Sequence, residues 1–228
     1  MGLRMKRFKC HIVLTFLLFL SVHGCGEESP PPPEQKAPEY EGIIVAVGDS
    51  LTEGLGVAEE SAYPALLEKK LSAQGYRYQV INAGISGETS SGTLSRITWV
   101  LNLKPDIVIL VIGGNDGFRG IDPALIKENI TKIIKVLKEN NVIIVLGGMK
   151  IVQNLGRDYA TDFEEIYPEV ARGEAVIFMP FFLSDVAGIP ALNQTDGIHP
   201  TAEGYRVIVD NTTPYVIEAI KAHKAKMN

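Results

Sequence analysis

Five short apolar runs limit the folds that are open to this chain more than any other feature of the sequence. They are rich in Val and Ile, mostly lack polar alternation, and are separated by amphipathic stretches; the runs are 43–48, 78–82, 106–113, 142–148 and 176–179. Strands of this kind are covered on both faces, as in repeated βαβ units around a parallel sheet. We therefore predict an α/β fold with a five-stranded parallel sheet between two layers of helices.

Three of the intervening segments carry clear helix signals. Residues 61–74 have Pro64 in the first turn and Gly75 as a C-terminal stop. A second helix is predicted to start at Asp122 and Pro123, with an apolar face formed by Ile126, Ile130, Ile133, Ile134 and Leu137. A third is predicted to run from residue 200 to about 223, and we expect Pro214 to split or kink it.

The first 40 residues have the pattern of an export leader and a spacer. Four basic residues within 1–9 precede an apolar run at 12–22, which is about half the length of a membrane span of roughly 20 residues. Gly24-Cys25 resembles the site at which bacterial lipoproteins are cleaved and acylated, although His23 departs from that pattern. We predict a lipoprotein signal peptide at 1–24, a lipid anchor at Cys25, a Pro-rich linker at 25–40 and a domain at 41–228; an ordinary signal peptide is the alternative.

Cysteine usage and charge exclude several classes of protein. The only cysteines are Cys10 and Cys25, so the predicted domain has neither a disulfide framework nor a cysteine metal site. Loss of residues 1–24 would remove four positive charges, which changes the formal net charge from −5 to −9. An acidic surface argues against nucleic acid as a partner and against general binding to anionic membranes. Membrane contact is expected through the anchor alone.

A serine follows the first apolar run in Gly48-Asp49-Ser50. A hydroxyl at the start of the element after a strand is exposed, and its backbone N–H is free to bind a developing oxyanion. Thr52 excludes a Gly-x-Ser-x-Gly elbow, and no Gly-Lys-Ser/Thr follows that would indicate a phosphate loop. Taken alone, the segment is better explained as an ordinary turn without chemistry.

The histidine count decides which base could serve this serine. His11 and His23 fall in the leader, and we expect His223 to lie in a solvated tail among lysines. Only His199 is left, and Asp196 lies three residues before it, near enough to orient one ring nitrogen. The same residues and Pro200 could instead form the cap and first turn of a helix, and the two interpretations are compatible.

Two further loops could supply hydrogen-bond donors to an oxyanion. Gly84 lies in the segment 82–90, where the missing side chain would let a backbone N–H approach a substrate, and Asn115 in 113–117 could offer its amide. Each segment taken alone is more often an ordinary turn.

Together the four segments resemble the four blocks of the SGNH or GDSL hydrolases, in that family's order and spacing. The resemblance covers residues 43–221 and rests on 48–51, Gly84 within 82–87, 113–116 and 196–200. It implies a flavodoxin-like three-layer fold and hydrolysis of acyl esters or thioesters without metal or cofactor. It also implies a triad of Ser50, Asp196 and His199 and an oxyanion hole formed by Ser50, Gly84 and Asn115.

Within that family the chain is similar to the bacterial arylesterase, acyl-CoA thioesterase and lysophospholipase group, in part through 154–159 and 180–182. The loop 149–156 lacks the prolines usual in the group, so acyl-chain preference is left open. Candidate substrate-binding residues are Asp49, Ile151, Val152, Leu155 and Phe181. The apolar ones among them, and Phe182, could equally belong to the core. We expect a monomer with a small-molecule substrate, exported to the periplasm or cell surface and anchored to the outer membrane where the host has one.

Three other functions fit parts of the sequence. An esterase that removes acetyl groups from sugars or cell-surface polymers would use the same residues. A surface lipoprotein that binds without catalysis would share the fold, but its loops would not need Ser50, Asn115, Asp196 and His199 together. A flavin-binding module has little support in the loops.

Overall fold

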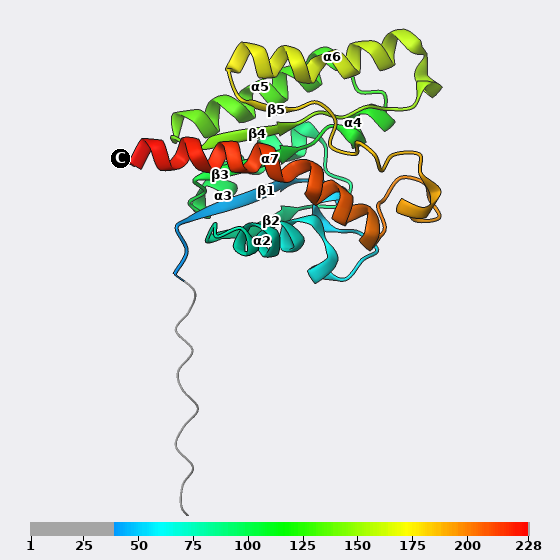
Figure 1. The fold of residues 1–228 in the computed structure, drawn as a ribbon. Coiled ribbons are helices and arrows are strands. Elements are labelled where there is room, and N and C mark those ends of the chain that lie inside the picture. Colours follow the sequence, from blue (N-terminus) through cyan, green and yellow to red (C-terminus); the bar gives the residue numbers. More distant parts are fainter. Residues whose placement is uncertain (1–38, 228) are drawn as a thin grey trace, which may run out of the picture. The chain divides into compact units, whose positions relative to one another are not determined.

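The computed structural model describes residues 39–227, and the predicted leader, the anchor at Cys25 and nearly all of the linker lie outside that range. A five-stranded parallel sheet forms its centre (Figure 1), as predicted, with the strand order β2-β1-β3-β4-β5. The strands are β1 Gly42–Gly48, β2 Tyr78–Gly84, β3 Ile107–Val111, β4 Ile143–Gly147 and β5 Ile177–Met179. All five residues of β3, the middle strand, are buried, so both faces of the sheet are covered.

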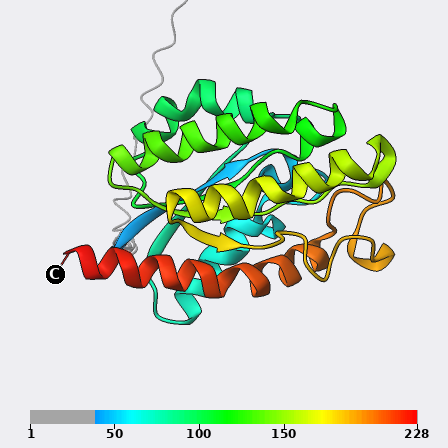
Figure 2. The ribbon, with the colours of Figure 1, turned by 90° about the horizontal axis from the view of Figure 1, so that it is seen from above.

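Helices cover the two faces (Figures 1 and 2). On one side, α2 (Tyr63–Ala73) packs against the C-terminal helix α7 (Ala202–Met227). On the other, α5 (Pro123–Glu139) lies between α3 (Ser90–Asn102) and α6 (Arg157–Glu174). Short helical segments occupy the connections: α1 Ser50–Glu53, η1 Glu59–Ser61, α4 Gly114–Phe118, η2 Gln153–Leu155 and η3 Pro190–Leu192. The three-layer prediction is confirmed.

The sequence correctly predicted the start of α5 and the end of α2. The side chain of Asp122 caps α5 by accepting from the N–H of Ala124 at 2.9 Å, and the five apolar residues of the predicted face are buried. Gly75 follows the end of α2 in the left-handed region, at φ +84°, where a residue with a side chain would be strained.

Pro214 does not divide the last helix, which runs unbroken from Ala202 to Met227. Proline removes the hydrogen bond to the carbonyl four residues earlier, here that of Asp210. The hydroxyls of Thr212 and Thr213 bond to carbonyls of the preceding turn at 2.7 and 2.6 Å, and Val216, Ala219 and Ile220 are fully buried beyond the proline. Packing on both sides of Pro214 therefore holds the helix together.

The strand order creates a switch point between β1 and β3, at the carboxyl ends of the strands. The chain leaves β1 toward β2 on one side and reaches β3 on the other, so the loops after β1 and β3 diverge at their carboxyl ends. Ligands bind at such a switch point in open α/β sheets. In the described range, no helix combines the length and apolar character that crossing a membrane requires.

Candidate active site

Ser50 lies at the carboxyl end of β1, where the backbone turns directly into α1. Asp49 caps this short helix by accepting from the N–H of Leu51 at 3.0 Å. Ser50 is the first helical residue, so its own N–H has no intrahelical acceptor, and within residues 39–227 no other group accepts from it. The turn thus presents a hydroxyl and a free donor on the same residue.

The Ser50 hydroxyl meets His199 across 149 residues of sequence. Its Oγ lies 2.8 Å from Nε2 of His199, whose Nδ1 lies 2.7 Å from Oδ2 of Asp196. An ionised carboxylate can only accept, so Nδ1 carries the ring hydrogen and Nε2 is left as the acceptor. The serine hydroxyl therefore donates to the imidazole, which is the arrangement needed for proton transfer away from Oγ.

A compact loop holds the histidine in place. Asn193 pairs with Pro200 as an isolated antiparallel bridge, and the N–H of Gln194 donates to the carbonyl of His199 at 2.7 Å. The Gln194 amide donates in turn to the carbonyl of Leu55 at 2.7 Å. Because Leu55 follows α1, this bond ties the histidine loop to the serine helix.

Asp196 keeps its charge through the hydrogen bonds it accepts. Its bond from His199 has the largest effect, and Oδ1 also accepts from the N–H groups of Ile198 and His199 at 2.9 and 3.0 Å. These bonds lower the pKa of Asp196 to about 2. This carboxylate is therefore ionised across the neutral pH range.

Asp49 joins the serine turn to Asn115. Its Oδ2 accepts from Nδ2 of Asn115 at 3.0 Å while its Oδ1 holds Leu51. Burial raises the pKa of Asp49 to about 6, against the opposing effect of these hydrogen bonds. An amide NH₂ has two donors, so the second N–H of Asn115 stays available to a substrate. Asp49 thus holds Asn115 in place and also lines the pocket described below; its contact with a substrate stays a prediction.

Asn115 stands on α4, which a buried carboxylate fastens to its neighbour. Asp116 is fully buried and accepts from the N–H and hydroxyl of Ser90, at 2.8 and 2.6 Å. Asn129 of α5 donates to the same hydroxyl at 3.0 Å. This network fixes the start of α3 and the helix that presents Asn115.

The backbone N–H of Gly84 is not available to a substrate, contrary to the prediction. It donates to Oδ1 of Asn82 at 3.0 Å. A Cβ at this position would approach the N of Glu53 to 2.2 Å, so the glycine is required for close packing of β2 against α1. The sequence suggested close approach correctly, but the approach is to another part of this chain.

Gly87, three residues later, has no acceptor for its N–H within residues 39–227. The loop that carries it is held on both sides. Glu53 of α1 accepts from the N–H and hydroxyl of Ser86, and Arg119 beyond α4 donates to the Gly87 carbonyl at 3.0 Å. The loop therefore lies between the elements that carry Ser50 and Asn115.

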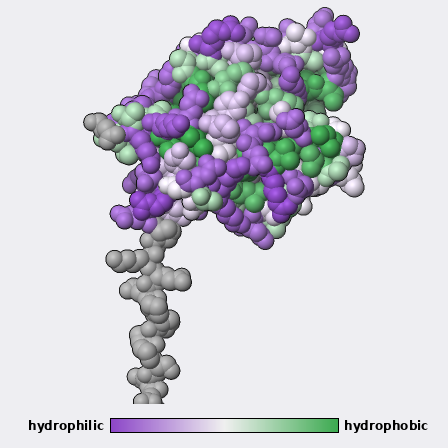
Figure 3. All heavy atoms as spheres, in the orientation of Figure 1, coloured by the Kyte–Doolittle hydropathy of each residue, from purple (hydrophilic) through white to green (hydrophobic). Residues whose placement is uncertain are grey.

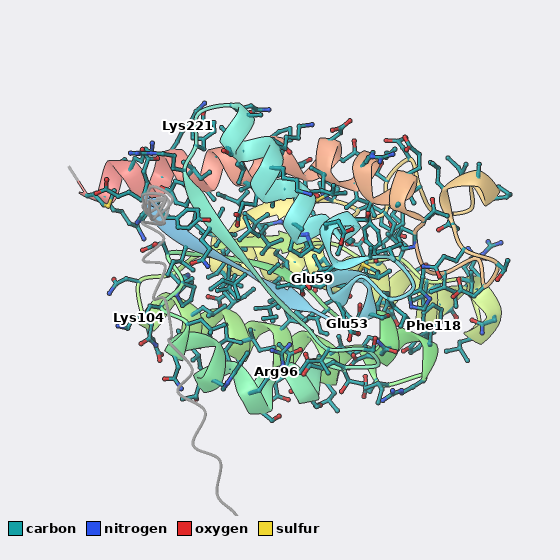
Figure 4. All side chains as sticks on the ribbon, turned by 90° about the horizontal axis from the view of Figure 1, so that it is seen from below. Glu53, Glu59, Arg96, Lys104, Phe118 and Lys221 are labelled. Atoms are coloured by element: carbon teal, nitrogen blue, oxygen red, sulfur yellow. The ribbon has the colours of Figure 1, made fainter. Side chains whose placement is uncertain are left out.

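A buried ion pair supports the same loop from beneath. Arg96 of α3 contacts Glu88 through two nitrogens, each at 2.6 Å, and its Nη2 also donates to the carbonyl of Ala83 at 2.8 Å. Figure 4 shows Arg96 on the helix layer below the sheet, with Glu53 nearer the carboxyl ends of the strands. Sequence reasoning missed this pair because nothing in the spacing of residues 88 and 96 indicates burial.

Ser50 and His199 lie in a pocket of about 520 Å³ with largely apolar walls. Ile151, Val152 and Phe181 line it, whereas Leu155 does not and Phe182 is a fully buried core residue. Other wall residues were not predicted; they include Leu51, Phe118, Met149, Leu183 and Ile198. Phe118 and Ile198 follow the Asn115 and Asp196 segments directly, and that proximity was the available signal.

His223 is buried, so its assignment to a solvated tail was wrong. Its Nδ1 lies 2.8 Å from the Tyr78 hydroxyl, and its Nε2 lies 3.2 Å from Oδ1 of Asp106. Tyr78 begins β2 and Asp106 precedes β3, so the histidine closes the end of the sheet opposite Ser50. Its contacts hold α7 against the strands, and it does not line the pocket described above.

Comparisons with known proteins identify the family of the chain. The model of the GDSL-like Lipase/Acylhydrolase family matches residues 46–207. Esterase TesA of Pseudomonas aeruginosa is 37% identical over 172 residues, which cover 75% of this chain and 86% of that protein. Thioesterase 1/protease 1/lysophospholipase L1 of Escherichia coli K12 is 31% identical over 204 residues, which cover 89% and 90%.

Among solved structures, a psychrotrophic esterase EstA from Pseudoalteromonas sp., inhibited by monoethylphosphonate, has a TM-score of 0.76. It is 30% identical in sequence, and the match covers 79% of this chain and all of that one. On the family match and these relatives, the chain belongs to the GDSL-like lipase/acylhydrolase family of serine ester hydrolases.

Proposed function

We propose that Ser50 is the nucleophile, His199 the general base and Asp196 the carboxylate that orients the base. The observation that carries this proposal is the unbroken chain of contacts at the pocket, 2.8 Å from Ser50 Oγ to His199 Nε2 and 2.7 Å from His199 Nδ1 to Asp196 Oδ2. Both lengths suit strong hydrogen bonds, and the tautomer they require leaves Nε2 ready to accept a proton.

In the proposed reaction, His199 takes the Ser50 proton as Oγ bonds to the acyl carbonyl carbon, and the carbonyl oxygen gains the charge. The imidazolium then protonates the leaving alcohol or thiol as its bond to the acyl carbon breaks, which leaves an acyl-serine. Water attacks this ester with His199 again as base, and the proton returns to Ser50 as the acid leaves. Asp196 stabilises the charged imidazolium in both halves.

The charge on the carbonyl oxygen needs donors that already point at it. We assign this role to the Ser50 N–H, the second amide N–H of Asn115 and the N–H of Gly87. The first and last have no acceptor within residues 39–227, and Asp49 fixes the orientation of the Asn115 amide. Each such donor typically contributes about 10²- to 10³-fold to the rate.

Asp49→Asn tests the orienting role of that carboxylate and is expected to trade activity for stability. The pKa of Asp49 rises from 3.8 to about 6 on folding, so the native state binds more protons in that window and stability falls as pH rises through it. The charge therefore costs about 3 kcal/mol at pH 7. Asn would remove this cost, and its NH₂ would turn the Asn115 amide away from the substrate.

The measurement combines urea unfolding at pH 4 and pH 7.5 with kcat. The variant is expected to be more stable at pH 7.5 by up to about 3 kcal/mol, to match the parent at pH 4, and to lose about 10²-fold in kcat. Asp162→Asn, an exposed change on α6, is the control and should alter neither. An active variant, or one whose added stability does not depend on pH, would contradict the assignment.

The substrate class follows from the pocket walls and from the relatives. Leu51, Met149, Ile151, Phe181 and Leu183 offer apolar contact to an acyl chain, and relatives carry the names esterase, arylesterase, thioesterase and lysophospholipase. We infer acyl esters or thioesters with chains longer than acetyl. A panel of acetyl and octanoyl esters separates this activity from that of an O-acetylesterase, for which acetyl would be preferred.

Covalent labelling tests the nucleophile directly. A fluorophosphonate reacts only with an activated serine, and the relative EstA is described as inhibited by monoethylphosphonate. We expect one label, found on the peptide that contains Ser50, and weaker labelling of His199→Ala. Ser72→Ala, on an exposed position of α2, should label normally. Absence of label on the folded protein would instead favour a binding module without catalysis.

We further propose that the protein is a monomer that is exported and anchored through Cys25. The N-terminal pattern supports the export and the anchor. The basic residues, the apolar run and Gly24-Cys25 support this location. A spacer of Pro-rich sequence would then separate the anchor from the domain.

A further inference from the structure

Exposed apolar side chains gather at one end of the domain. Among residues 39–227, eleven large apolar side chains are exposed, and seven of them lie in the connections that follow the carboxyl ends of the strands. Every strand contributes at least one of these seven, which we call the apolar rim: Leu55, Ile85, Phe118, Val152, Leu155, Ile189 and Ile198. They are between 41% and 63% exposed.

Hydrogen bonds and contacts connect the parts of the rim. Gln194 joins the Leu55 segment to a shallow hollow that also contains Ile189. The loop of Ile85 is bonded to α1 through Glu53 and to the end of α4 through Arg119, and Leu155 lies beside Gly120, just beyond α4. Figure 3 shows apolar surface at the end of the domain where these loops lie, and Figure 4 shows Phe118 at that end, with Lys104 and Lys221 at the other.

The rim is continuous with the candidate active site. Phe118, Val152 and Ile198 belong to the rim and also line the pocket that contains Ser50. Single exposed apolar residues are ordinary, but a contiguous group around a pocket indicates a binding surface. An acyl chain that left a lipid layer could therefore reach Ser50 without passing through water. We propose that the apolar rim docks on a neutral, zwitterionic lipid surface and delivers aggregated esters to the pocket; this rests on the proposed function.

Charge decides which kind of lipid surface fits. Residues 39–227 contain 24 acidic and 17 basic side chains, a formal net charge of −7, which disfavours approach to an anionic layer. Within three residues of rim positions, the chain carries three basic side chains, Arg119, Lys150 and Arg157, and acidic side chains that include Glu53, Asp158 and Asp196. Mixed signs suit the paired charges of a zwitterionic headgroup, whereas a basic patch would be needed for an anionic one.

The only tryptophan of the chain makes the docking orientation measurable. Trp99 is 52% exposed on α3, outside the rim. The full chain is mixed with vesicles of dioleoylphosphatidylcholine, some with brominated acyl chains, and compared with Leu155→Trp made in a Trp99→Phe background. The rim indole is expected to shift to shorter wavelength and to be quenched by the brominated chains, while Trp99 does neither.

A second experiment measures how changes in the apolar rim alter the rate of hydrolysis. Leu55→Ser, Ile85→Ser and Ile189→Ser, combined, change three rim residues that do not line the pocket. The triple variant is expected to hydrolyse 4-nitrophenyl laurate in these vesicles at least about tenfold more slowly. Hydrolysis of dissolved 4-nitrophenyl butyrate should stay unchanged. The matched control changes three exposed apolar residues elsewhere, Tyr40→Ser, Trp99→Ser and Leu125→Ser, and should keep both rates.

The outcomes separate this proposal from the one it rests on. If the parent protein does not hydrolyse dissolved butyrate, the proposed function fails, whereas the indole measurement still reports docking. If butyrate is hydrolysed but the rim indole does not shift, or shifts together with Trp99, docking through the rim is refuted. A shift that appears only with phosphatidylglycerol vesicles would overturn the choice of a zwitterionic surface.

Discussion

Ser50→Ala is expected to lower kcat for 4-nitrophenyl butyrate by about 10⁴- to 10⁶-fold and to leave the fold intact. Alanine removes Oγ, which is the atom that would bond to the acyl carbon and the group 2.8 Å from His199. The residual rate would come from the oxyanion donors and from binding alone. Because Ser50 lines the pocket and begins a helix, where alanine is well accommodated, its replacement is expected to leave the packing unchanged.

The measurement is steady-state kinetics with unfolding in urea as a check on the fold. Ser72→Ala, the exposed serine change on α2, should retain full activity. A Ser50→Ala protein with more than about one hundredth of the parent kcat would show that the hydrolysis takes place without this hydroxyl, and the triad assignment would have to be abandoned.

Asp196→Asn is expected to lower kcat by about 10³- to 10⁴-fold. The Asn oxygen can keep the bonds from the N–H groups of Ile198 and His199, so the loop should hold its shape. Its NH₂, however, would donate to Nδ1 and favour the tautomer with hydrogen on Nε2. That nitrogen could then no longer accept the Ser50 proton.

The pH dependence of this loss follows from the lowered pKa of Asp196. With a pKa of about 2 in the fold against 3.8 ordinarily, the carboxylate adds stability above pH 3.8, and this contribution is lost as pH falls through about 2. The activity lost in Asp196→Asn should therefore be the same from pH 5 to pH 9. Asp185→Asn, in the same long connection, is the control; a loss below tenfold for Asp196→Asn would argue against the orienting role.

The sheet was readable from the sequence because buried parallel strands need continuous apolar runs, and the chain has five. Two of the five long helices in residues 39–227 were not located. Helix α3 contains Gly92 and several β-branched residues, and α6 contains Pro168 and Gly173, which weaken local helix signals. The spacing of Phe163, Ile166, Tyr167 and Val170, all buried, was the signal that would have revealed α6.

For the site, elimination among four histidines led to His199, and the structure places it against Ser50. Gly84 was misassigned because the order of residues in a loop does not show which backbone N–H groups already donate to a nearby side chain. Here the N–H of Gly84 donates to the side chain of Asn82. The burial of His223 could not be predicted either, because it depends on the length of α7 and on the strands against which that helix packs. Pocket walls and buried ion pairs are products of tertiary packing, so residues such as Met149 and Arg96 could not be assigned in advance.

The contact between positions 50 and 199 also bears on when this enzyme can first act. Ribosomes synthesise the serine early and the histidine near the end. If the proposed triad is correct, a nascent or truncated chain that stops before position 199 contains a hydroxyl with no base to activate it. During synthesis the chain would be unable to attack acyl groups, and in a refolding experiment the return of turnover would report closure of the last connection rather than formation of the sheet.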